Sequence, residues 1–427
     1  MNLRHRMLLG VLALLIIAAA RPDASDPHFG QQWGLHRIRA HEAWSVSQGE
    51  GVLVAVLDTG VDLTHPDLAG ALARRVDGSV LGHDFVDGDD DPTDEHGHGT
   101  MVAGIVAAQT ANGIGVASVA PRARIMPVRV LDAHALGPNS SVEEGIRWAV
   151  DHGADVINLS LEIAREMTAA TERSNPTIAS PDRIVRYAWS RGVVVVAASG
   201  NDSEDFTDYP TDSPVLLVGA SKEHDERAGF SDAGRLDAVM APGVNIVSTW
   251  CWPCGSRAKH RIGQSEGTSY AAAHVTGAVA LLRSAGYSPT AAVNRLRHTA
   301  KDIGVSGPDI RTGFGRIDVA AALGLPTSRS GRGRGASESV PQQAADALAP
   351  NASLSPRVVL EAPGGRRADS TVGAVEERAG TFSAGQTGSV RSWAVLAAAL
   401  LVADVAALWW VTVRDQFSRR SNRAWPR

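Results

Sequence analysis

An aspartate, a histidine and a serine stand where each could take part in nucleophilic catalysis. Asp58 ends the apolar run 51–57, and a carboxylate at the end of a buried strand is costly unless a donor such as an imidazole binds it. His98 begins a run of small residues, and Ser269 begins a predicted helix whose dipole and free N–H groups favour developing negative charge. Together they could perform acyl transfer: Asp58 orients His98, His98 takes a proton, and Ser269 attacks a carbonyl.

Each of these residues lies in a longer motif. The motifs are VLDTGVD at 56–62, HGTMVAG at 98–104 and GTSYAAAHVTG at 267–277. Taken alone, DTG is more often a turn at a strand end and GTS more often a helix cap. In this order, the three motifs resemble those of the subtilisin-like serine protease family (peptidase S8, subtilases) over about residues 26–325. The resemblance implies a serine endopeptidase with Asp58, His98 and Ser269 as its catalytic residues.

The resemblance also assigns two neighbours of these motifs. His96 shares the histidine motif, but the family has Gly-Thr directly after its base, which selects His98 and leaves His96 near the base or facing solvent. Asn201 follows an apolar run within ASGN and matches the oxyanion-hole asparagine, whose amide acts with the Ser269 N–H. In another fold, Asn201 would be an ordinary turn residue.

The segment that would pair with substrate departs from the family pattern. Ser160, Leu161 and Glu162 stand where the family usually has Ser-Leu-Gly, and the resemblance implies that they bind the peptide. Glu162 either selects a basic residue near the cleaved bond or points to solvent. Ala273 stands where the family commonly has proline, which affects the expected local geometry but not the nucleophile.

Calcium is the expected cofactor, with a structural role. One acidic loop offers oxygen ligands at alternating positions: Asp84, Asp87, Asp89, Asp91 and Thr93. Its spacing is similar to a calcium loop of thermitase-like members, and the alternative is a solvated acidic turn. A second family site is matched by the side chains of Asp67 and Asn112 and the carbonyls of Ile114 and Val116, with Asp26 as a further candidate.

Cys251 and Cys254, in CWPC, are the only cysteines of the chain. Outside the cytoplasm, we expect them to form a small local disulfide. Thioredoxin-like exchange would need the pair at a helix start in a separate fold. Zinc would need two more ligands, and His260 alone is too few.

The rest of residues 25–326 predicts the elements that must hold these side chains. Apolar β-branched runs, typical of strands buried on both faces, occur at 51–57, 154–161, 192–199, 214–220 and 236–240. Helices are predicted at 98–109, 141–153 with Ser141 as cap, 181–192, 269–284 and 288–296. This alternation predicts a doubly wound α/β sheet with ligand sites at the carboxyl ends of its strands. The resemblance implies the subtilisin-like three-layer fold, a mostly parallel central sheet with helices on both faces.

Both ends of the chain predict contact with a membrane. Arginines before the apolar run 7–20 predict a signal peptide, 1–24, with an uncleaved anchor as the alternative. After the peptidase domain, residues 327–391 form a Ser/Gly/Arg/Pro-rich linker, and 392–413 are apolar and long enough for one transmembrane helix. Arginines in the tail, 414–427, place it in the cytoplasm and the protease domain outside.

Asp404, within the expected span, predicts a transmembrane partner, although single acids also occur unpaired in Ala-rich spans. All but three of the 41 basic residues are arginine, which together with the Ala and Gly content indicates a GC-rich bacterial genome. The net charge of −5 argues against nucleic acid as a partner. No foldase prodomain is expected between the signal and the protease.

We therefore expect a single-pass protein of the bacterial cell membrane whose extracytoplasmic domain hydrolyses protein or peptide substrates. Its layout resembles that of mycosins, the membrane-bound subtilases of type VII secretion. The first alternative is a catalytically idle or dual-role scaffold of an envelope or secretion complex. The second is disulfide exchange at CWPC.

Overall fold

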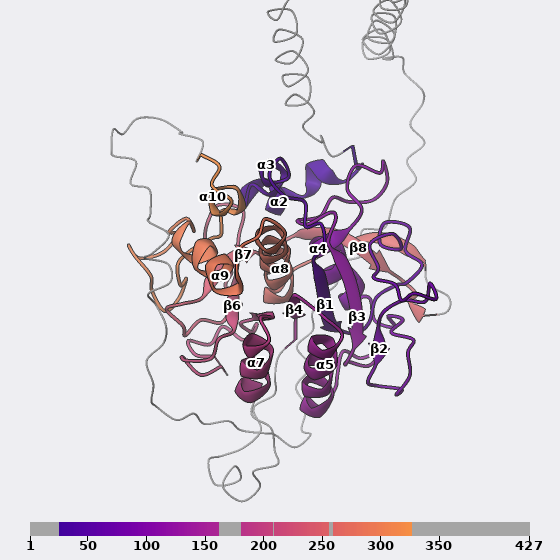
Figure 1. The fold of residues 1–427 in the computed structure, drawn as a ribbon. Helices are drawn as coiled ribbons and strands as arrows, with labels where there is room; N and C mark the ends of the chain where they lie inside the picture. The colour runs from indigo at the N-terminus through magenta and orange to yellow at the C-terminus, as the bar shows by residue number, and fades with distance from the viewer. Residues whose placement is uncertain (1–24, 162–180, 208, 256–258, 327–427) are drawn as a thin grey trace, which may run out of the picture. The chain divides into compact units, whose positions relative to one another are not determined.

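A seven-stranded parallel sheet lies at the centre of the described part of the chain (Figure 1). The computed structural model describes residues 25–161, 181–207, 209–255 and 259–326. The strand order is β2-β3-β1-β4-β5-β6-β7, and every neighbouring pair is parallel. The strands are β1 Leu53–Asp58, β2 His83–Asp84, β3 Arg124–Arg129, β4 Val156–Leu159, β5 Val194–Ala198, β6 Leu216–Ser221 and β7 Val239–Pro242.

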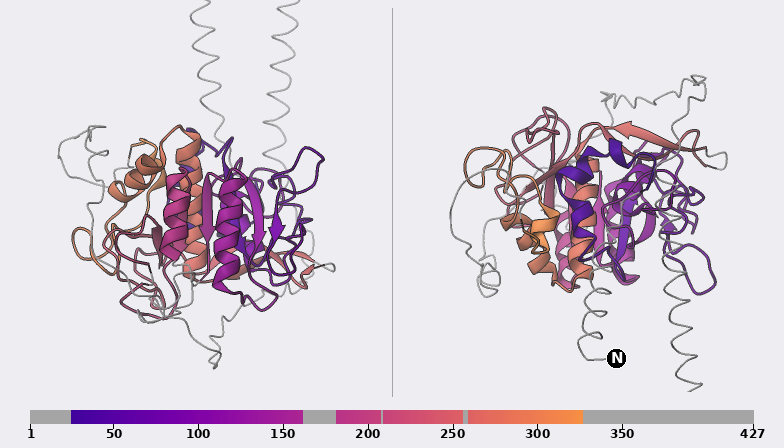
Figure 2. Two further views of the ribbon diagram at one scale, coloured as in Figure 1. Left: turned by 60° about the horizontal axis from the view of Figure 1, so that its bottom comes forward. Right: turned by 90° about the horizontal axis from the view of Figure 1, so that it is seen from above.

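Helices cover both faces of this sheet and bury a hydrophobic core on each. On one face, α5 (Asn139–Asp151) and α7 (Pro181–Ser190) lie side by side, as Figure 2 shows, and contribute Ile146 and Val185 to one core. On the other face, α4 (His98–Ala107) and α8 (Thr268–Ser284) contribute to the second core. The predicted three-layer α/β fold with a mostly parallel sheet is therefore confirmed.

Shorter elements complete the described part. An antiparallel hairpin is formed by β8 (Ile246–Cys251) and β9 (His260–Ser265). The remaining helices are η1 Phe29–Gln31, α2 Trp33–Arg37, α3 Ala40–Ala43, α9 Pro289–His298 and α10 Val319–Ala322. Ser288 caps α9 by accepting a hydrogen bond from the Ala291 N–H at 3.2 Å.

The predicted strands and helices correspond to observed elements, whereas the strands β2, β3, β8 and β9 and the short helices η1, α2, α3 and α10 were not predicted. The strand β3 was not expected, because Pro127 within it lacks an N–H and argues against a sheet interior, yet β3 pairs with both β1 and β2. The prediction that Ser141 caps α5 is wrong, because the helix begins at Asn139 and no side chain caps it.

Several predicted segments lie outside the described residues: the signal peptide 1–24, Glu162, the linker 327–391, the transmembrane helix 392–413 with Asp404, and the tail 414–427. Within the described ranges, no helix is both long and apolar enough to cross a bilayer.

Candidate active site

Asp58 and His98 meet at the carboxyl end of β1. Asp58 is the last residue of the strand and is fully buried, and His98 is the first residue of α4. The Nδ1 atom of His98 lies 2.7 Å from Oδ1 of Asp58. Because an ionised carboxylate only accepts, Nδ1 is the donor, and Nε2 keeps the lone pair that can take a proton.

The surroundings of His98 favour its protonated form. Burial lowers the pKa of His98, but the charge of Asp58, its hydrogen bond and the charge of Asp94 together raise that pKa above the ordinary value. An imidazole whose positive form is stabilised in this way suits a general base that receives a hydroxyl proton.

Gly99 allows α4 to approach the end of β1 so closely. A Cβ atom at this position would lie 2.0 Å from the carbonyl oxygen of Gly60 and 3.0 Å from Cβ of Asp58. The small residue after His98 is therefore a condition for the contact between His98 and Asp58.

Ser269 lies in the first turn of α8, close to the end of β4. Its hydroxyl donates to the carbonyl oxygen of Ser160 at 3.1 Å, and the hydroxyl of Ser160 donates to the carbonyl oxygen of Ser269 at 2.7 Å. In this conformer, the Ser269 proton is directed at the residue that follows β4. The hydroxyl would have to rotate to direct its proton at His98.

Asn201 follows β5, and its side chain is turned toward the start of α8. Its Oδ1 atom accepts hydrogen bonds from the N–H of Thr268 at 2.9 Å and from the Thr268 hydroxyl at 3.1 Å. Because the oxygen is used in this way, the amide NH2 is the group of Asn201 that can donate to a ligand. Thr268 immediately precedes Ser269, so this donor lies beside the first turn of the helix.

Comparison with known proteins relates this arrangement to a family. Residues 49–315 match the subtilase family (Peptidase S8). The chain belongs to the subtilase family. Over 296 residues, it is 40% identical to the thermophilic serine proteinase of Bacillus sp. (strain AK1), covering 69% of this chain and 67% of that protein. It is also 39% identical over 303 residues to thermitase of Thermoactinomyces vulgaris, covering 70% of this chain and 98% of thermitase.

Among solved structures, a protease of Pseudoalteromonas arctica is similar, with 30% identity and a TM-score of 0.59, over 71% of this chain and 99% of that one. These relationships confirm the resemblance seen in the motifs. The subtilase is a serine endopeptidase.

The predicted substrate segment of the subtilase contacts Ser269 through its first residue. Ser160 is buried, and its hydroxyl and carbonyl both contact Ser269. Leu161 is also buried, and Glu162 lies outside the described residues. The assignment of these three residues to substrate binding stays a prediction.

Asp94 is a residue of the site that sequence reasoning missed. Its buried carboxylate accepts from the Thr59 hydroxyl, next to Asp58, at 2.8 Å. It also accepts from the N–H groups of His96 and Gly97 and from the N–H and hydroxyl of Thr100, at 2.5–2.9 Å. Burial raises the pKa of Asp94, and these donors oppose that effect. One carboxylate thus joins the loop of Asp58 to the loop of His98. Its place four residues before His98 was the only signal for it in the sequence.

Asp232 plays a similar part beside Asn201 and was also missed. Its Oδ1 atom accepts from the N–H groups of Asp202 at 3.0 Å and Glu204 at 2.7 Å, and its own N–H donates to the Gly200 carbonyl at 3.0 Å. Asn201 is therefore held in a loop that is fixed on both sides. No motif in the sequence connects these distant positions.

Of the two histidines, His98 is the one that makes a hydrogen bond with the carboxylate of Asp58. The ring centroids of His96 and His98 are 6.4 Å apart. Burial lowers the pKa of His96, and the charge of His98 lowers it further.

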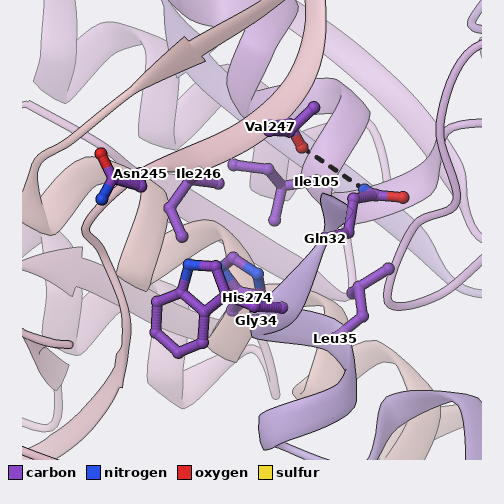
Figure 3. Close-up of a pocket in the computed structure, with 9 residues that line it drawn as sticks. Gln32, Gly34, Leu35, Ile105, Asn245, Ile246, Val247 and His274 are labelled. Carbon is purple, nitrogen blue, oxygen red and sulfur yellow. Dashed lines mark hydrogen bonds between the residues drawn. The ribbon is translucent and has the colours of Figure 1, made fainter. Parts of the chain in front are cut away.

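His274 of α8 lines a small cavity with residues of the N-terminal arm (Figure 3). The imidazole is buried, and its Nδ1 atom lies 2.7 Å from the carbonyl oxygen of Tyr270. Burial lowers the pKa of His274 to about 4, so the ring is neutral at pH 7.

The acidic loop that was expected to bind calcium holds an arginine instead. The guanidinium of Arg129 lies 2.6 Å from Asp84 and 2.7 Å from Asp87. Asp89 accepts from the Asp91 N–H, and Thr93 donates to Asp91. Because Arg129 already neutralises two of the carboxylates, the donors of this loop, as arranged here, do not fit a cation. In the described ranges, no three His, Cys, Asp or Glu side chains are placed to hold a metal ion.

The second expected calcium site has a different charge balance. Asp67 accepts from the Val116 N–H and the Asn112 amide at 2.8 Å, and Asp26 accepts from three backbone N–H groups of residues 111–113. Burial raises the pKa of Asp67 to about 6, and the charge of Asp26 contributes to that increase. The hydrogen-bond donors on these two buried carboxylates are uncharged, so an oxygen-binding cation fits this pair.

Cys251 and Cys254 form a disulfide at the end of β8. With both sulfur atoms used and Nδ1 of His260 placed 2.8 Å from Asp62, this segment does not form a zinc site.

Proposed function

We propose that this subtilase hydrolyses peptide bonds of extracytoplasmic proteins with Asp58, His98 and Ser269 as its catalytic triad and Asn201 as an oxyanion donor. The observation that carries the proposal is the 2.7 Å contact between Nδ1 of His98 and Oδ1 of Asp58. It leaves Nε2 unprotonated on a helix that packs against the helix of Ser269.

In the proposed reaction, the Ser269 hydroxyl rotates from Ser160 toward His98 when substrate enters. His98 Nε2 takes the hydroxyl proton as Oγ attacks the scissile carbonyl, and Asp58 stabilises the resulting imidazolium. The Asn201 amide and the Ser269 N–H stabilise the negative oxygen. His98 then returns the proton to the leaving amine, and water hydrolyses the acyl-enzyme by the same steps.

Labelling with a fluorophosphonate probe tests the nucleophile. We expect the purified full-length protein to be labelled and Ser269→Ala to remain unlabelled. Ser284→Ala, at the other end of α8, is the matched control and should label like the wild type. A folded wild type that never reacts with the probe would favour the idle scaffold.

We also propose that the protease domain faces the outside of a bacterial cell, held by the segment 392–413 with the tail in the cytoplasm. The apolar length of that segment and the arginines that follow it support this orientation. Treatment of intact cells with an external protease tests it, because only an exposed domain would be degraded while the tail is protected. Crosslinking that depends on Asp404 would identify a transmembrane partner.

Calcium is proposed only for the pair Asp26 and Asp67, with Asn112 and the carbonyls of Ile114 and Val116 as further oxygen ligands. The hydrogen-bond donors of the two carboxylates are uncharged, which supports this choice over the loop that contains Arg129. When bound there, calcium would tie the N-terminal arm to the 111–116 loop and take no part in the chemical step.

A further inference from the structure

The β8–β9 hairpin lies against the helix that begins with His98. On β8, the Thr249 hydroxyl donates to the Thr100 carbonyl at 2.7 Å, and the Ser248 hydroxyl donates to the Met101 carbonyl at 2.8 Å. Both acceptors belong to the first turn of α4. The first turn that carries His98 is therefore fixed by one strand of the hairpin.

The other strand of the hairpin is fixed to the loop that follows Asp58. His260 Nδ1, at the start of β9, lies 2.8 Å from Oδ2 of the buried Asp62. The next residue, Arg261, accepts through its carbonyl a hydrogen bond from Nε2 of His65 at 3.1 Å. The hairpin thus contacts the loops of both Asp58 and His98.

The disulfide lies where the hairpin meets the turn before His98. A Cβ atom on Gly97 would lie 3.2 Å from the carbonyl oxygen of Cys251, so the turn and the hairpin are in close contact. Sγ of Cys251 is 3.9 Å from the hydroxyl oxygen of Thr100. Just beyond Cys254, the Gly255 N–H donates to the Asp94 carbonyl at 2.8 Å.

We infer that the Cys251–Cys254 disulfide is a positioning element for His98. It ties Gly255, and through it the main chain of Asp94, to the rigid end of β8. Since the Asp94 side chain holds the Gly97 and Thr100 N–H groups, opening the disulfide loosens the turn that sets the distance between His98 and Asp58. Activity then depends on an oxidised pair. This inference rests on the proposed triad.

The redox step is a thiol–disulfide exchange with a dithiol reductant. A thiolate of the reductant attacks Sγ of Cys254, the less buried of the two residues, and the S–S bond breaks with Cys251 leaving as a thiolate. The second thiol of the reductant resolves the mixed disulfide. The protein gains two electrons and two protons as two thiols, and the reductant becomes a cyclic disulfide.

The test compares the full-length enzyme before reduction, after a dithiol and after reoxidation, on a peptide substrate without cysteine. We expect reduction to lower kcat about tenfold or more with little change in KM, and reoxidation to restore it. We also expect the lower limb of the pH profile of kcat/KM to move to lower pH, because the contact with Asp58 raises the pKa of His98. Thermal unfolding, recorded in parallel, checks that the reduced protein is folded.

A variant that carries both Cys251→Ala and Cys254→Ser serves as the control, because the chain has no other cysteine. It should have the low kcat of the reduced enzyme and no response to the dithiol. Full activity after complete reduction, or loss of the whole fold on reduction, would overturn the positioning role while leaving the triad intact. An oxidised enzyme without activity would instead overturn the proposed function.

Discussion

The carboxylate of Asp94 accepts hydrogen bonds from both the loop that follows Asp58 and the turn that carries His98. In Asp94→Asn, an amide NH2 would face the N–H of Thr100 or of Gly97 and leave a buried donor without an acceptor. We expect a loss of about 1–3 kcal/mol in the free energy of unfolding and a lower kcat, measured by urea unfolding and peptide hydrolysis.

Asp77→Asn is the control for this substitution. Asp77 also accepts a backbone and a hydroxyl hydrogen bond, both from Ser79, but lies on the surface. Unchanged activity in both variants would show that Asp94 does not position His98.

We expect His274 to make the folded protein less stable in acid. Its pKa is about 4 in the folded protein, below the ordinary value of 6.5, so the unfolded chain binds the proton first. As the pH falls from 6.5 to 4, we expect protonation of His274 in the unfolded chain to lower the free energy of unfolding by about 3 kcal/mol. His274→Gln should not show this loss. Urea unfolding at several pH values measures this difference.

His298→Gln provides a matched comparison, since His298 makes the same contact to a carbonyl four residues earlier but on the surface. Its stability should follow the wild type at every pH. Equal acid sensitivity of His274→Gln and the wild type would contradict the assignment.

The motifs predicted the reactive residues but not the groups that hold them. Asp58, His98 and Ser269 stand in recognisable segments, whereas Asp94 and Asp232 are defined by hydrogen bonds that form only in the folded chain. The calcium ligands show the same limit, because spacing predicted the acidic loop but could not predict that Arg129 would enter it.

Among the contacts between elements, the packing of α4 against β1 leaves the least room for a larger side chain near the site. In Gly99→Ala, the new methyl group would lie 2.0 Å from the Gly60 carbonyl oxygen and force α4 away from Asp58. We expect a loss of about 3 kcal/mol in stability and a large loss of kcat. Unfolding and hydrolysis assays measure both.

Gly229→Ala is the comparison, because no atom lies within 4 Å of a Cβ at that position. It should retain wild-type activity. Should Gly99→Ala retain full activity as well, the close packing of α4 on β1 would not be needed for the reaction.

Element prediction succeeded where the hydrophobic pattern was strong. The buried strands β1, β4, β5 and β6 read as apolar runs, and Ser288 and Pro289 marked the start of α9. It failed for β3, whose Pro127 contradicts a strand assignment, since only tertiary packing places that proline in the sheet.

For the whole molecule, calcium is expected to stabilise the fold through Asp26 and Asp67. A ligand that binds only the folded state adds about 2.7 kcal/mol at a hundredfold excess over its Kd. We therefore expect a chelator to lower the thermal unfolding temperature of the wild type by several degrees. Asp67→Asn should unfold at a lower temperature than the wild type, and the chelator should not change its unfolding temperature.

Asp302→Asn is the control, because Asp302 accepts two backbone N–H groups in an exposed loop. It should keep the chelator effect. A wild type whose unfolding temperature does not change with the chelator would contradict the proposed calcium site at Asp26 and Asp67.

The long separation between positions 58, 98 and 269 also governs when the enzyme can first act. As the chain is synthesised from its N-terminus, Asp58 and His98 emerge well before Ser269, and α8 must still dock against β4, β5, β6 and β7. Pairings between segments so distant in sequence form late in folding. With the proposed triad, the emerging chain would have no nucleophile in place while its own loops are still unfolded, so we expect it to be unable to digest itself until the sheet is assembled.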